Sequence, residues 1–460
     1  MNIRSVLIAN RGEIAVRIVR AAKALGLRTV QVHSQADTDS LAVKLADAAV
    51  EIGPPPAKKS YLNIDAILAA AKAANVDAVH PGYGFLAENA DFADAVTAAG
   101  MTFVGPSGDA IRLLGDKVMA RAVAVKAGVP TVPGSDGRVA DLAEAVAIAS
   151  DIGFPVMVKA AAGGGGRGIR IAHDADEFAR LFPQASAEAA AAFGDGGLYL
   201  EKVIERARHI EVQILGDGEN FVHCFERECS LQRRRQKVWE EAPAIGLPDD
   251  VRSRLCESSV ALARQVGYSS AGTVEYLYDD ATQDFYFIEV NTRIQVEHPV
   301  TEMVSGIDLV QAMLRIAGGE KLSLRQDDIR IHGHAIECRI NAEDPYKNFM
   351  PWPGRIGQLR VPEGEGIRFD TMLFEGYQVP PFYDSLLGKL IVHGADRADC
   401  LARLQGALKE LVITGIATTI PLHAALASDP SVGEGRTHTR FLEPWLETDF
   451  AALKRAREDA

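Results

Sequence analysis

The chain has 460 residues, with a hydrophobic fraction of 47%, a charged fraction of 24% and a formal net charge of −13. This length exceeds what one hydrophobic core usually supports, so we expect several domains. The acidic balance argues against a nucleic-acid partner, and five scattered cysteines indicate a reducing, cytoplasmic setting. Because the apolar runs are short, the sequence predicts neither a secretory signal nor a membrane-spanning helix.

The first hundred residues alternate short β-rich runs with helical ones. Strands are predicted at residues 5–9, 29–33, 77–80 and 101–104, and helices at 14–25 and 89–99. This alternation is typical of a parallel, doubly wound sheet. The first strand–helix turn, Asn10-Arg11-Gly12-Glu13, lacks the three-glycine dinucleotide fingerprint, so no NAD site is expected there.

A glycine cluster follows a predicted helix at 116–128 and a hinge marked by Pro130 and Pro133. A strand at 155–159 ends in Lys159, and Gly163-Gly164-Gly165-Gly166 comes shortly after it. Another strand is predicted at 169–171, whereas a Walker P-loop would need a helix there. We therefore interpret the loop as a hairpin lid over a nucleotide, with Lys159 near its phosphates. A surface hairpin without a ligand is the alternative.

Two glutamates form a second candidate site. The segments 272–278 and 285–291 predict an antiparallel hairpin whose loop, if it spans 280–284, places Glu275 opposite Glu289. Side-chain alternation puts Glu289, Asn291 and Arg293 on the same face as Phe285 and Phe287. Facing carboxylates need a cation between them. Glu275, Glu289 and Asn291 therefore predict an all-oxygen Mg²⁺ site, with solvated surface glutamates as the alternative.

The densest positive cluster is Gln232-Arg233-Arg234-Arg235-Gln236-Lys237. Such a run is either a solvated face or an anion pocket for a small substrate, and the residues leave both open. The nearby His223 and Cys229 are interpreted as packing residues. After Gly318-Gly319, prolines and glycines predict a β-rich C-terminal domain that closes with a helix at 399–411.

Taken together, these motifs resemble the biotin carboxylase family, whose members have an ATP-grasp fold. The resemblance spans about residues 3–442 and rests on segments 8–15, 80–89, 115–117, the loop after Lys159, 289–303 and 337–345. It implies a multidomain α/β and α+β chain. The implied domains are a Rossmann-like N-terminal domain at 1–115, an ATP-grasp domain at 116–319 with a glycine-loop lid at about 131–203, and a β-rich C-terminal domain at 330–446.

The resemblance also implies an activity. It is the ATP- and bicarbonate-dependent carboxylation of biotin on a biotin carboxyl carrier protein, through carboxyphosphate. This is the first half-reaction of an acetyl-CoA or other acyl-CoA carboxylase, as in fatty acid biosynthesis. The implied cofactors are ATP and Mg²⁺ or Mn²⁺, with carrier-bound biotin as substrate. The implied partners are the carrier, a second copy in a homodimer, and a carboxyltransferase subunit.

Site residues follow from the matching positions. By resemblance, Lys117 and Lys159 contact the ATP phosphates, Gly165 and Gly166 form the lid, Glu201, Lys202, Val203 and Ile204 hold the adenine, and His209 lies near the ribose. Glu275, Glu289 and Asn291 hold the metal, while Lys237, Arg293 and Val296 bind bicarbonate. Glu297 is the implied general base, and Arg339 contacts the biotin ureido group.

The chain departs from the family pattern in two places. Arg235 stands where the family usually has His or Asn, and Ala161-Ala162 stands where a Ser-Gly pair is common. None of the eight methionines neighbours a lysine, so we expect biotin to be attached to another chain. One alternative function is another ATP-grasp ligase that activates bicarbonate or a carboxylic acid. The other is a non-catalytic nucleotide-binding protein.

Overall fold

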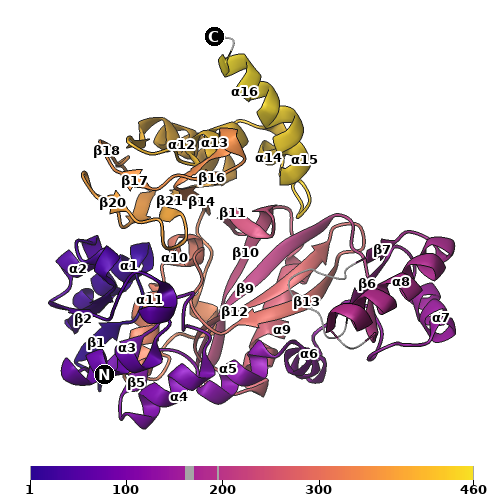
Figure 1. The fold of residues 1–460 in the computed structure, drawn as a ribbon, viewed down its shortest axis with the longest axis horizontal. Coiled ribbons are helices and arrows are strands. Elements are labelled where there is room, and N and C mark those ends of the chain that lie inside the picture. Colours follow the sequence, from indigo (N-terminus) through magenta and orange to yellow (C-terminus); the bar gives the residue numbers. More distant parts are fainter. Residues whose placement is uncertain (1, 161–169, 194–195, 459–460) are drawn as a thin grey trace.

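The structure, a computed structural model, describes residues 2–160, 170–193 and 196–458. A large sheet lies at its centre (Figure 1). An N-terminal body and a small lobe lie on opposite sides of this sheet, and a C-terminal body lies above it.

The N-terminal body is a five-stranded parallel sheet in the order β3-β2-β1-β4-β5. Its strands are β1 (Ser5–Ile8), β2 (Arg28–His33), β3 (Ala48–Glu51), β4 (Ala78–His80) and β5 (Thr102–Phe103). Its helices are α1 (Gly12–Ala24), α2 (Leu41–Leu45), α3 (Ile64–Ala73), α4 (Ala90–Ala98) and α5 (Gly108–Gly115). Val6 packs toward α1 and Leu7 toward α3 and α4, so both faces are covered as a parallel sheet requires. The predicted doubly wound sheet is confirmed.

The small lobe carries a three-stranded antiparallel sheet in the order β7-β6-β8. Its elements are α7 (Leu142–Ile152), β6 (Val156–Ala160), β7 (Arg170–Ala172), α8 (Ala175–Phe193) and β8 (Leu198–Lys202), reached through α6 (Lys117–Lys126). Val156 and Val158 pack against α7 and α8. Pairing of β6 with β7 confirms a hairpin around the glycine cluster, although Gly165 and Gly166 lie outside the described residues.

The large sheet has eight strands in the order β13-β12-β9-β10-β11-β14-β21-β19, each antiparallel to its neighbours. They are β9 (Ala207–Asp217), β10 (Phe221–Arg233), β11 (Gln236–Ala242), β12 (Ser269–Asp279), β13 (Asp284–Asn291), β14 (His334–Asn341), β19 (Ile367–Thr371) and β21 (Leu386–Gly394). Helix α9 (Asp249–Gln265), with α6, covers one face of the β13–β10 half. Helix α10 (His298–Ser305) packs on the part formed by β11, β14 and β21, and α11 (Leu309–Ala317) packs against α1.

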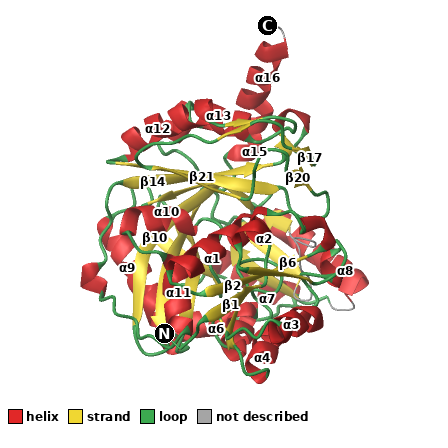
Figure 2. Cartoon of the chain, turned by 90° about the vertical axis from the view of Figure 1, so that its left-hand side faces the viewer, coloured by secondary structure: helices red, strands yellow, loops and turns green. Residues whose placement is uncertain are grey.

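One relationship in this sheet was not foreseen from the sequence. Strand β11 comes from the predicted ATP-grasp region and β14 from the predicted C-terminal region, yet the two pair directly. The two regions therefore share one continuous sheet, whose C-terminal part, β14 and β21, is covered by α12 (Arg397–Glu410) and α13 (Ile420–Leu426) (Figure 2).

The prediction that the C-terminal body closes with the helix at 399–411 is wrong. After α12 and α13 come α14 (Pro430–Gly433), α15 (Leu442–Trp445) and α16 (Ala451–Glu458), and Leu426, Val432 and Leu442 complete the core under β14 and β21. The remaining strands are short: β15 (Glu343–Asp344), β16 (Met350–Pro351), β17 (Gly354–Arg355), β18 (Leu359–Arg360), β20 (Gln378–Val379) and β22 (Val412–Ile413). Within the described residues, no helix combines the length and apolar character needed to cross a bilayer.

Candidate active site

A cleft of about 880 Å³ lies where the N-terminal body, the large sheet and the C-terminal body meet. Most of the predicted site residues line it: His209, Lys237, Glu275, Glu289, Asn291, Arg293, Val296, Glu297 and Arg339. The structure thus gathers into one place side chains that are up to 130 positions apart in the sequence (339 − 209).

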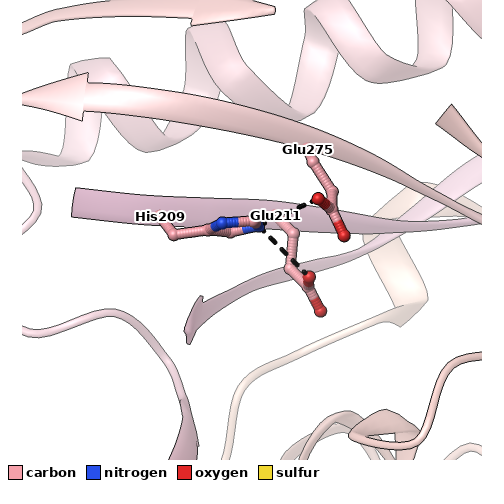
Figure 3. Close-up of side chains that lie close together, drawn as sticks. All are labelled: His209, Glu211 and Glu275. Atoms are coloured by element: carbon pink, nitrogen blue, oxygen red, sulfur yellow. Dashed lines mark ion pairs between the residues drawn. The ribbon is translucent and has the colours of Figure 1, made fainter. Parts of the chain in front are cut away.

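Strand alternation explains why polar side chains collect on this face. In β9, Ile210 and Val212 point into the core under α9, so His209, Glu211 and Gln213 point the other way. Figure 3 shows His209 and Glu211 beside Glu275 of the neighbouring strand. The His209 Nε2 atom lies 3.1 Å from Glu275 Oε2 and 3.8 Å from Glu211 Oε2.

The predicted pairing of Glu275 with Glu289 is confirmed, but the predicted side-chain faces are wrong. Glu275 pairs with Glu289, whereas Tyr276 pairs with Phe287, so Ile288 is an extra residue in β13. This bulge reverses the alternation. Phe285 and Phe287 pack in the core under α9, while Glu289 and Asn291 face the cleft. The predicted loop at 280–284 is also one residue too long, since Asp279 pairs with Asp284.

Lys237 of β11 lies among three carboxylates. Its Nζ atom is 2.5 Å from Glu211 Oε2, 2.9 Å from Glu275 Oε1 and 2.6 Å from Glu297 Oε1. Burial alone would lower the pKa of Lys237, but the charges of Glu211, Glu297 and Glu275 outweigh burial and raise it well above its ordinary value. The ammonium group therefore stays protonated and is held by anions that a bound anionic substrate can replace.

Glu297 is the predicted general base, and two cations bind its carboxylate. Oε1 accepts from Lys237, and Oε2 accepts from Arg339 Nη2 at 3.0 Å. Burial would raise the pKa of Glu297, but Lys237, Arg339 and Arg227 hold it well below its ordinary value. The carboxylate is thus kept in the proton-accepting form.

Arg293 and Val296 lie on the segment between β13 and α10. Arg293 Nε pairs with Glu88 Oε2 at 2.9 Å, and its Nη2 donates to Asn291 Oδ1 at 3.1 Å. The carbonyl oxygen of Val296 accepts from Lys389 Nζ at 2.8 Å. These contacts fix the segment beside Glu297 and link it to both the N-terminal body and the C-terminal body.

Several residues of the site were missed by the sequence reasoning. Arg227 is fully buried, and it donates to Glu211 at 2.5 Å and to Gln295 at 2.9 Å. Gln295 in turn donates to Glu275 Oε1 at 2.8 Å. The alternation of His209, Glu211 and Gln213 with apolar residues was a usable signal for Glu211. No pattern in the sequence around Arg227 marks it as a site residue, because only the fold brings it next to Glu211 and Gln295.

Among the described residues, the predicted ATP contacts Lys117, Lys159 and 201–204 do not line this cleft. Lys159 of β6 forms an ion pair with Glu201 of β8 in the small lobe. The N–H groups of Lys202 and Val203 donate to the carbonyl oxygens of Pro133 and Pro155, which ties this segment to the hinge. Lys117 begins α6, where its charge lowers the pKa of Glu289 against the larger effect of burial.

The metal prediction can be tested against the side chains present. Glu275 and Glu289 face each other across β12 and β13, Asn291 donates its amide N–H to Glu275 at 2.9 Å, and Asn291 Oδ1 accepts from Arg293 Nη2 at 3.1 Å. Burial and the charge of Glu275 raise the pKa of Glu289, as expected for carboxylates without a cation between them. These hard oxygen donors fit Mg²⁺. A cluster of His209, Glu211 and Glu275 also has metal-like spacing.

The residues of the basic run at 232–237 lie in different surroundings. Arg234 and Arg235 have positive φ of 49° and 67° and form the exposed turn between β10 and β11. Arg233 packs over the Phe349 ring at 3.9 Å. Lys237 points into the carboxylate cluster, and Gln232, Arg235 and Gln236 also line the cleft, so the run borders the site on one side and solvent on the other.

The fold and the site define an ATP-grasp ligase. Family profiles support this class: "Biotin carboxylase, N-terminal domain" matches residues 2–111, "Carbamoyl-phosphate synthase L chain, ATP binding domain" matches 116–325, and "Biotin carboxylase C-terminal domain" matches 337–444.

Individual relatives agree with the profiles. The chain is 54% identical to biotin carboxylase of Pseudomonas aeruginosa, over 97% of this chain and 99% of the relative. It is 48% identical to a pyruvate carboxylase subunit of Methanothermobacter thermautotrophicus, over 99% and 92% of the two chains. The biotin carboxylase domain dimer of Hydrogenobacter thermophilus 2-oxoglutarate carboxylase, solved with MgADP, ADP and bicarbonate, matches with a TM-score of 0.86 and 47% identity, covering 97% and 99%. The chain belongs to the biotin carboxylase family and catalyses ATP-dependent carboxylation of biotin.

Proposed function

We propose that the cleft binds bicarbonate between Lys237 and Arg293 and that Glu297 acts as its general base. The observation that carries this proposal is the position of Lys237. Its ammonium group donates hydrogen bonds to Glu297 and also to Glu211 and Glu275. An incoming anion competes for Lys237 and frees a Glu297 oxygen. Proton transfer to a positioned side chain typically raises the reaction rate by about 10²–10⁴-fold.

The next step follows from the charges. Once Glu297 has taken its proton, a bicarbonate oxygen attacks the γ-phosphorus of ATP, and the bond to ADP breaks to give carboxyphosphate. Lys117, Lys159 and Lys237 are the cations that offset the charge spreading over the phosphoryl oxygens. Glu275, Glu289 and Asn291 would hold Mg²⁺ or Mn²⁺, which supplies further charge neutralisation when bound. The MgADP and bicarbonate in the H. thermophilus structure support this assignment.

Biotin enters from the side of Arg339. We assign Arg339 and Arg293 to the ureido oxygen, where negative charge develops as N1 gives its proton to the phosphate that carboxyphosphate releases together with CO₂ and then attacks that CO₂. Both arginines are only partly exposed, at 18% and 20%, and both border the cleft. The nucleotide contacts of Glu201, Lys202, Val203, Ile204 and His209, and the lid role of Gly165 and Gly166, belong to the same proposal.

The remaining proposals concern organisation and partners. We place domain boundaries at 115/116 and near 319–330, with the lid at 131–203, and we propose a biotin carboxyl carrier protein, a homodimer, and a carboxyltransferase subunit. The dimer described for the H. thermophilus domain supports the homodimer. A cytoplasmic location is supported by five cysteines that are all free and buried. The relatives include both a pyruvate carboxylase subunit and a 2-oxoglutarate carboxylase domain.

A direct assay tests the central proposal. Purified protein with saturating Mg-ATP, labelled bicarbonate and free biotin should yield labelled carboxybiotin, and ATP cleavage should require bicarbonate. Bicarbonate-dependent ATP cleavage that biotin does not stimulate, without labelled biotin, would contradict it.

A further inference from the structure

Two fully buried glutamates lie side by side where the two halves of the large sheet join. Glu240 of β11 pairs with Glu337 of β14, and both side chains are 0% exposed. Their sequence neighbours Trp239 and Cys338 pack into the core under α12, so the glutamates project from the opposite face, toward α10. The proposed roles of Lys237, Glu297 and Arg339 do not use this pair.

The oxygens of the pair are poorly satisfied. Glu240 Oε1 accepts from Arg339 Nε at 2.6 Å, but Glu240 Oε2 has no hydrogen-bond donor among the described residues. Within the same part of the chain, neither oxygen of Glu337 has a donor. Two ionised carboxylates facing each other without donors would be strongly unfavourable. A proton on one of them removes the charge repulsion, and its O–H can donate to an unpartnered oxygen of the other, so that two of the three unpartnered oxygens are joined by one hydrogen bond.

The cations around the pair are engaged elsewhere. Lys389 of β21 is bound by the Val296 carbonyl oxygen at 2.8 Å and by Glu13 Oε1 at 3.2 Å. Arg339 bridges Glu240 and Glu297, and Lys237 is shared by three other carboxylates. Burial raises the pKa of Glu337 well above its ordinary value; Lys389 opposes this, and the charge of Glu240 adds to it. Burial, against Arg339, raises the pKa of Glu240 to about 7.

We propose that Glu240 and Glu337 share one proton and serve as positioning residues for Arg339, holding its guanidinium beside Glu297 with the remaining N–H groups directed at the cleft. One negative charge on the pair balances Arg339 while leaving it free to bind Glu297 Oε2. A second negative charge would draw the guanidinium toward the pair and away from the cleft. The positioning role rests on the proposed contact between Arg339 and biotin, whereas the shared proton does not.

The first test is the pH dependence of the KM for biotin. In the wild-type enzyme this KM should rise at alkaline pH as the pair loses its proton. Glu337→Gln carries an amide N–H that cannot ionise, so its KM for biotin should stay within about twofold of wild type at neutral pH and remain flat at alkaline pH. The KM for ATP should change equally in both proteins. The matched control is Glu257→Gln on the exposed face of α9, which should keep the wild-type profile.

The second test needs no variant. An atomic-resolution crystal structure of the wild-type protein near neutral pH should show unequal C–O bond lengths in Glu240 or Glu337 and a short contact between the two carboxyl groups. Equal bond lengths in both residues, or identical pH profiles for wild type and a folded Glu337→Gln, would overturn the proposal. If the wild-type enzyme forms no carboxybiotin, the proposed function fails. The crystal structure would still show whether Glu240 and Glu337 share a proton.

Discussion

Glu275 and Glu289 lie directly opposite each other on the cleft face of β12 and β13. This juxtaposition depends on the single extra residue Ile288, which turns Glu289 out of the row occupied by Phe287. Two facing carboxylates weaken the sheet unless a cation joins them.

Replacing Glu289 by Gln should raise the thermal stability of the protein in the absence of metal, because one member of a repelling pair loses its charge. The same change should raise the Mg²⁺ concentration needed for half-maximal activity by at least roughly 10- to 100-fold, the effect that is typical when only a residue supporting a metal ligand is lost. Calorimetry with and without Mg²⁺ checks the first effect, and titration of ATP cleavage checks the second. A lower melting temperature without metal would argue that Glu289 has a structural role instead.

Arg293→Ala should reduce carboxylation of biotin far more than binding of ATP. Loss of one preorganised donor to a developing oxyanion typically lowers kcat by about 10²–10³-fold. Since Arg293 also pairs with Glu88, the fold of the variant should be checked by its circular dichroism. Arg315→Ala, which breaks an exposed pair with Glu320, is the matched control and should leave kcat unchanged. Equal losses in ATP affinity and carboxylation would remove Arg293 from its assigned role.

Glu297→Gln should lower the rate by about 10²–10⁴-fold without weakening ATP binding. The pH profile offers a separate check. Burial would raise the pKa of Glu297, but Lys237, Arg339 and Arg227 hold it well below the ordinary value, so the carboxylate persists as pH falls. Its stabilising ion pairs are present above the unfolded-state pKa and are lost only as pH falls through the lower, folded-state value. We expect no acid limb near pH 6 from this residue in a pH–rate profile of ATP cleavage.

Arg227→Met should lower the free energy of unfolding by about 3–5 kcal/mol, the scale for breaking a buried ion pair on one side. Arg227 is 0% exposed, and its removal leaves Glu211 with Lys237 as its remaining cationic partner. Urea denaturation measures the change. The control is Arg254→Met on the exposed face of α9. Its free energy of unfolding should stay within about 0.5 kcal/mol of the wild-type value.

The sequence predicted the alternation of strands and helices well, because the signals for β1, α1 and β2 are local. It also placed Glu275 opposite Glu289, but through two errors that cancel: the loop was taken one residue too long, and the bulge at Ile288 was missed. A bulge leaves little trace in a hydrophobic pattern, since one residue shifts the alternation without changing composition.

Contacts between residues far apart in the chain could not be predicted from the sequence. Nothing near Arg227 or Glu240 indicates that they lie beside Glu211 and Arg339, since those contacts join separate strands of one sheet. The basic run was ambiguous for a similar reason. Its members are consecutive, yet the turn at Arg234 and Arg235 exposes both side chains, with Arg235 at the edge of the cleft, while Lys237 points inward.

The pairing of β11 with β14 has a consequence for any attempt to divide the protein. A chain cut between residues 319 and 330 would leave two open strand edges, with unpaired N–H and C=O groups along 239–242 of β11 and 335–338 of β14. Apolar Trp239 would be uncovered on one piece, and Ile336 and Cys338 on the other. Such edges invite pairing with further chains. Either piece, produced alone, should therefore aggregate, and co-expression of both should restore a soluble complex.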